Sequence, residues 1–347
     1  MRVKKFFQLA INLIPFVIFS PTIQASQIAW YVTFSGESAK PINNIYSLSV
    51  KDGSLQGEVV PATLGLHELR NMLISQDGKL LLLNSNKNDS RIVQFGPINK
   101  DGLTRNFIGN VVTTATAKGM IHPFFMAYDA NDYLYISVQD TNIVLRLNGS
   151  KASKPWTTTP VSSYLQKLFP AGEFYPGTFV GAATANIAPK TPVPTEQGGL
   201  SMKGNNSVRS LVIGPDNIFY VADEGKDRIT MYDSNGNYLG NITDANLGKP
   251  DELLYHAADN AIYISSPSTE CILRYDLSTK IINTFIHDPS RLADASGIAF
   301  GEDGNFYVAN RKTMSVYRYT AKGSKPVLFA GPFSDSPEGL LPVLSNK

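Results

Sequence analysis

The chain has 347 residues, 43% of them hydrophobic and 17% charged, with a formal net charge of +2 at pH 7. This apolar content is enough to bury a core and excludes a disordered chain. The small charge and the absence of a nucleic-acid-binding motif argue against nucleic acid as a partner. A single cysteine, Cys271, excludes an intramolecular disulfide, and its apolar surroundings in "CILRY" predict a buried thiol.

Residues 1–25 have the pattern of a secretory signal peptide. Three basic residues precede an apolar run over residues 6–19, and a polar segment then leads to Ala25. The run is too short to span a bilayer. We therefore expect cleavage after Ala25, export to the periplasm or out of the cell, and no membrane span in the mature protein. Removing this segment leaves 28 basic and 29 acidic residues, close to neutrality.

Five segments of the remaining chain share one pattern: an apolar strand, a turn rich in Asp, Asn or Gly, and a second strand rich in aromatic and β-branched residues. A third apolar strand and a more variable fourth follow each time, which is typical of a propeller blade. The turns are centred at Asp77, Asn131, Asp216, Asp259 and Asp303. The second and third segments are further apart than the others, with 85 residues between their turn centres.

This longer spacing contains a proline-rich stretch at about 155–206. It holds seven prolines and no aligned hairpin, and proline cannot donate to a sheet ladder. We expect an insertion here, within a single domain over 26–347. A seventh, degenerate blade is the alternative.

The two ends of the mature chain supply the missing blade. "IAWYVTF" (28–34) and "IYSL" (45–48) match the second and third strands of the unit, and "SPEGLLPV" (336–343) matches its first strand. Joined, they complete a sixth blade and remove the open sheet edge. The sequence predicts an all-β, six-bladed β-propeller closed by its own termini.

The most regular segment, "YVADEGKDRITMYDSNGNYLG" (220–240), resembles an NHL repeat, and "ASGIAFGEDGNFYVAN" (295–310) resembles the opening half of one. The resemblance implies the same six-bladed architecture as enzymes similar to gluconolactonase and senescence-marker protein, binding scaffolds, and peptide-processing lyases. It does not imply one activity. Within the regular segment, alignment with the other units suggests that Asp223 is a strand end and not a catalytic acid.

Residues at one offset in successive blades converge around the propeller axis. The first ring, seven positions before each turn centre, contains Arg70, Phe124, Arg209, Glu252, Ser296 and, in the closing blade, Glu338. The second ring, two positions earlier, contains Glu68, His122, Ser207, Pro250, Asp294 and Ser336. Asp251 lies between the rings.

These rings have more than one interpretation. The charges form a salt-bridge network between blades, or Arg70 and Arg209 bind a carboxylate or phosphate, whose geometry a guanidinium matches. His122 is a polar cap at a strand start or, with Glu68 and His67, part of a small metal or acid–base site. No histidine spacing typical of a metal site supports the second interpretation of His122.

The resemblance to the gluconolactonase-like family implies a divalent-cation site in the first ring. Glu338 matches that family's glutamate, and Glu252 or Asp251 its aspartate. Arg70 and Arg209 occupy the asparagine-like positions, and a guanidinium repels a cation and cannot coordinate it. We therefore expect no cofactor, and calcium, zinc or manganese belongs to the alternative interpretation.

We expect an exported, monomeric scaffold that binds a protein partner or a small anionic ligand at the channel mouth. The expected ligand-binding residues are Arg70, Arg209, Glu252, Glu338, Glu68, His122 and Asp294. A lactonase-like hydrolase or lyase, with Glu338 and Glu252 as metal ligands or acid–base groups, is the alternative. A third is an envelope or cell-surface assembly component that uses the insertion as its contact.

Overall fold

The computed structural model describes residues 26–75, 77–170, 174–181, 193–200 and 208–344. The predicted signal peptide lies outside this part of the chain. Among the described residues, no helix has the length and apolar character needed to cross a membrane.

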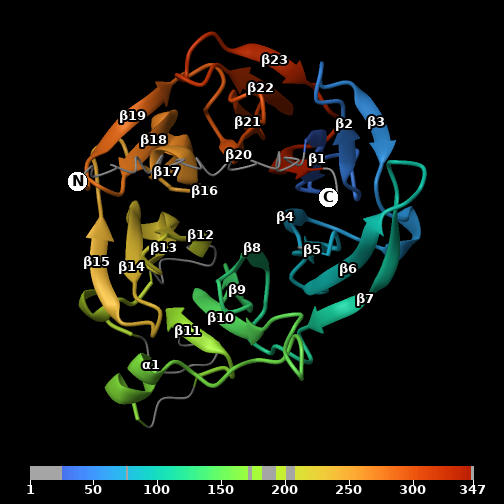
Figure 1. Cartoon of the computed structure of the whole chain (residues 1–347). Coiled ribbons are helices and arrows are strands. Elements are labelled where there is room, and N and C mark those ends of the chain that lie inside the picture. The colour runs from blue at the N-terminus through green and yellow to red at the C-terminus, as the bar shows by residue number, and fades with distance from the viewer. Residues whose placement is uncertain (1–25, 76, 171–173, 182–192, 201–207, 345–347) are drawn as a thin grey trace, which may run out of the picture.

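Six antiparallel sheets of four strands each stand in a ring, so the predicted six-bladed β-propeller is confirmed and the seven-bladed alternative is wrong (Figure 1). Blade 1 consists of β4 (Leu69–Ile74), β5 (Leu80–Asn84), β6 (Arg91–Ile98) and β7 (Arg105–Thr113). Blade 2 consists of β8 (Pro123–Tyr128), β9 (Tyr133–Val138), β10 (Ile143–Asn148) and β11 (Thr178–Gly181). Blade 3 consists of β12 (Val208–Ile213), β13 (Phe219–Asp223), β14 (Arg228–Tyr232) and β15 (Tyr238–Ile242).

The later blades repeat this arrangement, with the first strand of each unit innermost (Figure 1). Blade 4 consists of β16 (Leu253–His256), β17 (Ala261–Ser266), β18 (Cys271–Asp276) and β19 (Ile282–His287). Blade 5 consists of β20 (Ala295–Phe300), β21 (Phe306–Asn310), β22 (Ser315–Tyr319) and β23 (Val327–Ala330). Blade 6 consists of β24 (Pro337–Leu344), β1 (Gln27–Phe34), β2 (Tyr46–Leu48) and β3 (Leu55–Glu58).

Helical structure is short and lies in connections. The helices are α1 (Ser163–Leu168), η1 (Ala62–Leu64), η2 (Thr195–Gln197), η3 (Glu224–Lys226), η4 (Ala257–Asp259) and η5 (Pro267–Thr269). The helix α1 lies in the proline-rich stretch, where Ser162 caps it by accepting a hydrogen bond from the Leu165 backbone N–H.

The proline-rich stretch also contributes a strand that the sequence interpretation missed. The strand β11 pairs with β10 through the register Ile143–Gly181 and Val144–Val180, and it forms the outer edge of blade 2. An edge position tolerates proline nearby because only one side of the strand must pair. Part of the stretch therefore completes a blade.

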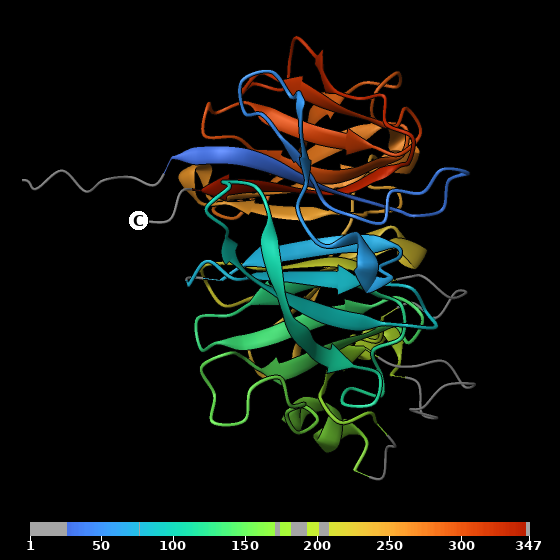
Figure 2. The same cartoon turned by 90° about the vertical axis from the view of Figure 1, so that its right-hand side faces the viewer.

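The predicted closure by the two ends of the chain is confirmed. The strand β1 pairs antiparallel with β24, with Tyr31 opposite Leu341, and it lies between blade 5 and blade 1 in the edge-on view (Figure 2). Next to this pair the buried carboxylate of Asp335 accepts hydrogen bonds from the backbone N–H groups of Gly36 and Ile42, at 2.9 and 2.8 Å. The closure thus has side-chain as well as backbone support.

Aromatic residues from the second strands fill the spaces between blades. Trp30 of blade 6 lies 4.3 Å from Tyr307 of blade 5, between ring centroids, and Tyr135 of blade 2 lies 4.6 Å from Phe219 of blade 3. All four side chains are buried. Such pairs stabilise a fold by roughly 0.5–1.5 kcal/mol each beyond the area they bury, which explains why the repeat has aromatic residues at this point.

The inner strands of neighbouring blades approach each other closely at Gly339 of β24. A Cβ at this position would lie 2.5 Å from the Arg70 carbonyl oxygen and 2.9 Å from Thr33 Oγ1. We expect Gly339→Ala to lower the free energy of unfolding by about 1–3 kcal/mol, because neither backbone can move without disturbing β4 or β1. Urea unfolding measures this.

The matched control is Gly109→Ala in the outer strand β7, where a Cβ would meet nothing within 4 Å. This control should be near neutral. Equal effects of the two substitutions would contradict the close-approach argument.

Candidate functional site

A cavity of about 500 Å³ opens at the end of the ring where the inner strands begin. Most of its lining is polar or charged. The lining residues are Ser35, Glu37, Ser38, Arg70, His122, Gln139, Arg209, Asp294, Arg311, Met314, Ser336 and Glu338. The structure thus places five of the seven predicted ligand-binding residues in the wall of one cavity.

The second ring enters the mouth through a repeated backbone turn. Glu68, His122 and Asp294 each precede an inner strand and have φ values of 53°, 58° and 79°. These values lie in the left-handed region, which costs a non-glycine residue free energy and persists where the surrounding structure holds it. The aligned Ser207 lies outside the described residues.

Arg311, which sequence reasoning missed, makes the largest number of ion pairs at the mouth. Its guanidinium binds Asp251 at 2.7 Å, Asp294 at 2.9 Å and Glu338 at 3.0 Å. Burial lowers the pKa of Arg311, but the carboxylates of Asp251 and Glu338 outweigh this and hold the pKa well above its usual value. Arg311 is therefore a fixed positive charge among three acids.

The position of Arg311 defines a third ring, eight residues after each turn centre and directly after the second strand. Its members are Ser35, Ser85, Gln139, Glu224, Pro267 and Arg311. This ring can be found from the alignment of the units, because its member Glu224 directly follows Asp223 in the regular segment. Asp223 itself is a buried strand end paired with Arg228 at 2.9 Å, whereas its neighbour Glu224 contacts the mouth residue Arg209.

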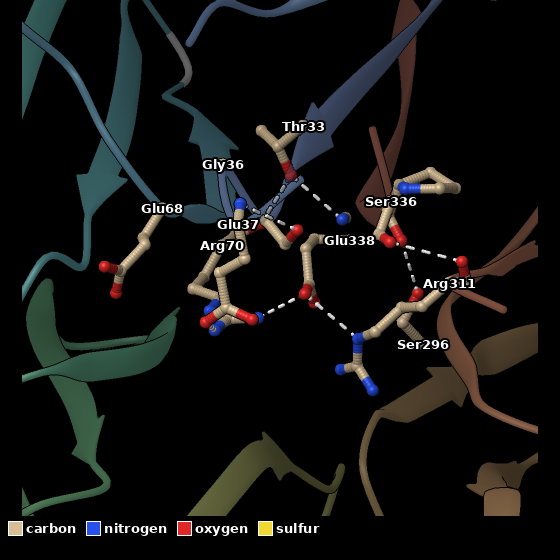
Figure 3. Close-up of polar contacts among 12 residues, drawn as sticks. Thr33, Gly36, Glu37, Glu68, Arg70, Ser296, Arg311, Ser336 and Glu338 are labelled. Carbon is tan, nitrogen blue, oxygen red and sulfur yellow. Dashed lines mark hydrogen bonds and ion pairs between the residues drawn. The ribbon is translucent and has the colours of Figure 1, made fainter. Parts of the chain in front are cut away.

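Arg70 and Arg209 lie on one aromatic ring. Their guanidinium carbons are 5.8 and 4.9 Å from the centroid of Phe124, a cation–π geometry. Arg70 binds Glu338, as Figure 3 shows. Arg209 binds the carboxylate of Glu224 at 2.6 Å and also donates to the side-chain oxygen of Gln139.

These contacts bridge every interface between neighbouring blades. Glu338 of blade 6 binds both Arg70 of blade 1 and Arg311 of blade 5 (Figure 3). The remaining bridges are Glu68–His122 at 3.4 Å, Arg209–Gln139, the Ser210 N–H to the Asp251 carbonyl at 3.1 Å, and Arg311–Asp251. The predicted salt bridges between blades are therefore present where blade 6 meets blades 1 and 5 and where blade 4 meets blade 5. Blade 3 is joined to blades 2 and 4 by hydrogen bonds that are not ion pairs.

His122 lies between two carboxylates. Its Nδ1 is 3.1 Å from Asp140, in the same blade, and its Nε2 is 3.4 Å from Glu68. All three side chains are mostly buried. His67 contributes its backbone N–H to Asn84 and does not line the cavity. The described residues contain no group of three or more His, Cys, Asp or Glu side chains arranged to hold a metal ion.

Glu252 lies below the mouth, between its polar ring and a second cavity. This lower cavity of about 490 Å³ is lined mainly by apolar side chains of all six inner strands, with Glu252 among them. Burial raises the pKa of the Glu252 carboxyl well above its usual value, and the nearby Asp251 and Glu338 raise it further. The Ile298 backbone N–H and Arg311 lower the pKa of Glu252, but not enough to return it to its usual value.

The metal ligands implied by the gluconolactonase resemblance do not fit a divalent cation here. The carboxylates of Glu338 and Asp251 are each bonded to the guanidinium of Arg311, and Glu338 also to that of Arg70. A cation near these oxygens would meet two fixed positive charges that cannot coordinate it. Guanidinium groups thus take the place that a metal would need.

We expect Arg311→Met to lower the free energy of unfolding by about 3–5 kcal/mol, because it leaves Asp251 buried without a cation and removes one of the two cations bound by Glu338. Urea unfolding measures the loss. Arg274→Met is the control, since its partners Asp259 and Asp276 are more exposed and such pairs contribute less than about 1 kcal/mol. Similar losses in both variants would contradict the role of Arg311.

The raised pKa of Glu252 predicts how stability changes with pH. The folded protein holds this proton more tightly than the unfolded chain, so its contribution is complete below the usual glutamate pKa of about 4.3 and is lost as the pH rises through the folded value. In Glu252→Gln this loss should disappear. We expect the stability of the variant relative to the wild type to increase from pH 5 to pH 8, in urea titrations. A difference in unfolding free energy between variant and wild type that stays constant over this pH range would contradict the prediction.

The chain matches no family model and no curated protein. Solved structures match the fold. A chain of the nidogen/laminin complex has a TM-score of 0.58 at 12% identity, covering 90% of this chain and 97% of that one. A streptogramin B lyase has a TM-score of 0.52 at 13% identity, with 90% and 91% covered. A 6-phosphogluconolactonase-like protein of Bacteroides uniformis has a TM-score of 0.54 at 14% identity, covering 87% of this chain and 82% of that one. At these identities the likeness shows the fold alone: the chain is a six-bladed β-propeller with lyase- and lactonase-like structural neighbours.

Proposed function

We propose that this propeller is a recognition protein whose channel mouth binds a small ligand through a carboxylate or phosphate group, with Arg70 as the principal contact. The observation that carries the proposal is an unused donor set on a buried side chain. Arg70 is 10% exposed and its Nε has no hydrogen-bond partner among the described residues. It lines the cavity at the mouth.

The Arg70 side chain has more hydrogen-bond donors than there are acceptors bonded to it. A guanidinium has five N–H donors. In the described part of the chain the Arg70 side chain makes one hydrogen bond, to Glu338, and the carboxylate of Glu37 lies 3.8 Å from Nη2. A planar anion takes two parallel N–H bonds from such a fork. Buried donors without partners cost free energy, so a ligand oxygen here removes a cost that the free protein carries.

Gln139 adds a second unused donor. Its side chain is 1% exposed and lines the cavity, its oxygen accepts a hydrogen bond from Arg209, and its Nε2 has no partner among the described residues. Arg209 thereby fixes the orientation of the Gln139 amide, with the nitrogen left for an acceptor. Arg209 is itself bound by Glu224 through two nitrogens, so its role is to position its neighbour.

The mouth is pre-organised for binding. Phe124 supports both guanidinium groups, and the bridges between blades hold the side chains that carry the charges. Fixed donors lose little conformational entropy when a ligand arrives. The cavity of about 500 Å³ is of the size that small ligands occupy. The predicted signal peptide would place this recognition outside the cytoplasm.

The test is calorimetric titration of the mature protein with a panel of small carboxylates and phosphates. For a ligand that binds, Arg70→Met should weaken affinity about 10- to 100-fold, the range expected for charge-assisted hydrogen bonds. Arg70→Lys keeps the charge and loses the fork, and it should recover only part of the affinity.

The control for this prediction is Arg274→Met, which removes an arginine that does not line the mouth cavity. It should leave affinity unchanged. Circular dichroism and urea unfolding establish that each variant is folded. Unchanged affinity in a folded Arg70→Met protein, or no binding of any carboxylate or phosphate, would contradict the proposed function.

A further inference from the structure

Resting on the proposed function, the geometry points to a zwitterionic ligand at the mouth, a short peptide with free termini. Its carboxylate binds Arg70 and Gln139, and its ammonium binds the carboxylate of Asp294, with Glu37 beside the entrance. The charge balance of the mouth, the exposure of its charges and their arrangement around the ring all favour such a ligand.

The mouth contains more acidic than basic groups. Arg70, Arg209 and Arg311 face five carboxylates within 4 Å of their nitrogens, namely those of Glu37, Glu224, Asp251, Asp294 and Glu338. A simple anion adds negative charge to a site that already has an excess of it, and like charges repel strongly in a partly buried site. A zwitterion makes the same contact with Arg70 and adds no net charge.

Two carboxylates of the mouth are much more exposed than its guanidinium groups. The carboxylates of Glu37 and Asp294 are 66% and 47% exposed, whereas the guanidiniums of Arg70, Arg209 and Arg311 are 10%, 17% and 17% exposed. Two negative charges of the mouth are therefore accessible, whereas its positive charges are mostly buried. An ammonium group reaches Asp294 without displacing protein contacts, since only one of its oxygens is bonded, to Arg311.

The two kinds of contact also come from opposite sides of the ring. Gln139 belongs to blade 2 and Asp294 precedes the inner strand of blade 5, and these blades face each other across a six-bladed ring (Figure 1). Arg70, on the neighbouring blade 1, completes the carboxylate side. A ligand that contacts both sides needs its two charges separated by a backbone, as in a peptide with free termini.

The hydroxyl and backbone groups of blade 6 complete the wall between these two sides. Ser336, which lines the cavity, donates from its hydroxyl to the Arg311 carbonyl oxygen at 3.2 Å (Figure 3). Ser35 donates to Asp335 at 3.2 Å. These short polar side chains leave room for a peptide backbone, which bulky residues at the same positions would fill.

The experiment compares matched ligands on the mature, full-length protein. A panel of dipeptides and tripeptides with free termini is titrated by calorimetry, and every peptide that binds is repeated as its N-acetylated form and its C-terminal amide. We expect at least a 10-fold weaker affinity for each modified form. Raising the pH from 7 to 9 should weaken binding of the free peptide, because its α-amino group loses its proton near pH 8, and leave an N-acetylated peptide unaffected.

A variant assigns the ammonium contact. Asp294→Asn should weaken binding of the free peptide about 10-fold and leave the affinity for its N-acetylated form unchanged or higher. Asparagine tolerates the left-handed backbone at this position, so the fold should be retained. Asp101→Asn, in an exposed turn outside the cavity, is the control and should change neither affinity.

The outcomes separate this inference from the proposed function. Equal binding of a free peptide and its N-acetylated form overturns the zwitterion inference and leaves recognition by Arg70 intact. Binding of simple carboxylates or phosphates together with failure of all peptides does the same. Binding of C-terminal amides as tightly as free peptides overturns both, since no anionic group is then required.

Discussion

The carboxylate of Glu338 connects the closure of the ring to the chemistry of its mouth. Glu338 lies on β24, the strand that the chain end contributes to blade 6, and it binds Arg70 of blade 1 and Arg311 of blade 5. Pairing of β24 with β1 therefore brings one acid between two guanidiniums from the flanking blades. Because a buried acid without a cation is costly, the ion pairs favour the closed ring, and the closed ring in turn fixes the ion pairs.

This coupling accounts for the rigidity that recognition requires. A blade that shifted relative to its neighbour would break a polar contact at the mouth as well as an aromatic contact such as Trp30–Tyr307 between the sheets. The two sets of contacts differ in kind, since the aromatic pairs bury a large apolar area and the contacts at the mouth are charge-assisted hydrogen bonds. The aromatic pairs thus add to the stability of the blade interfaces, and the polar contacts hold the side chains of the mouth in fixed positions.

The sequence predicted the fold and the location of the mouth better than it predicted the pairing within it. Repeat offsets were sufficient to bring Arg70, Arg209 and Glu338 to one cavity, because equivalent positions of a propeller must meet at the axis. Arg311 was missed because its ring lies one residue beyond the strand end at which the alignment of the units stopped. The commitment of Arg209 to Glu224 depends on side-chain rotamers, and the strand β11 lies in a proline-rich stretch without hydrophobic alternation, so neither had a periodic signal.

The three arginines of the mouth show how the acceptors around a guanidinium decide its role. Arg311 has a carboxylate for each of its three nitrogens and acts as a structural cation. Two nitrogens of Arg209 share one carboxylate oxygen of Glu224, and a third donates to the amide oxygen of Gln139, which leaves Arg209 as a positioning group for Gln139. Arg70 has one hydrogen-bonded acceptor and an unpaired Nε. Equal in charge and similar in burial, the three differ in unsatisfied hydrogen-bonding capacity, and this difference makes Arg70 the residue that a ligand can engage without breaking the ring.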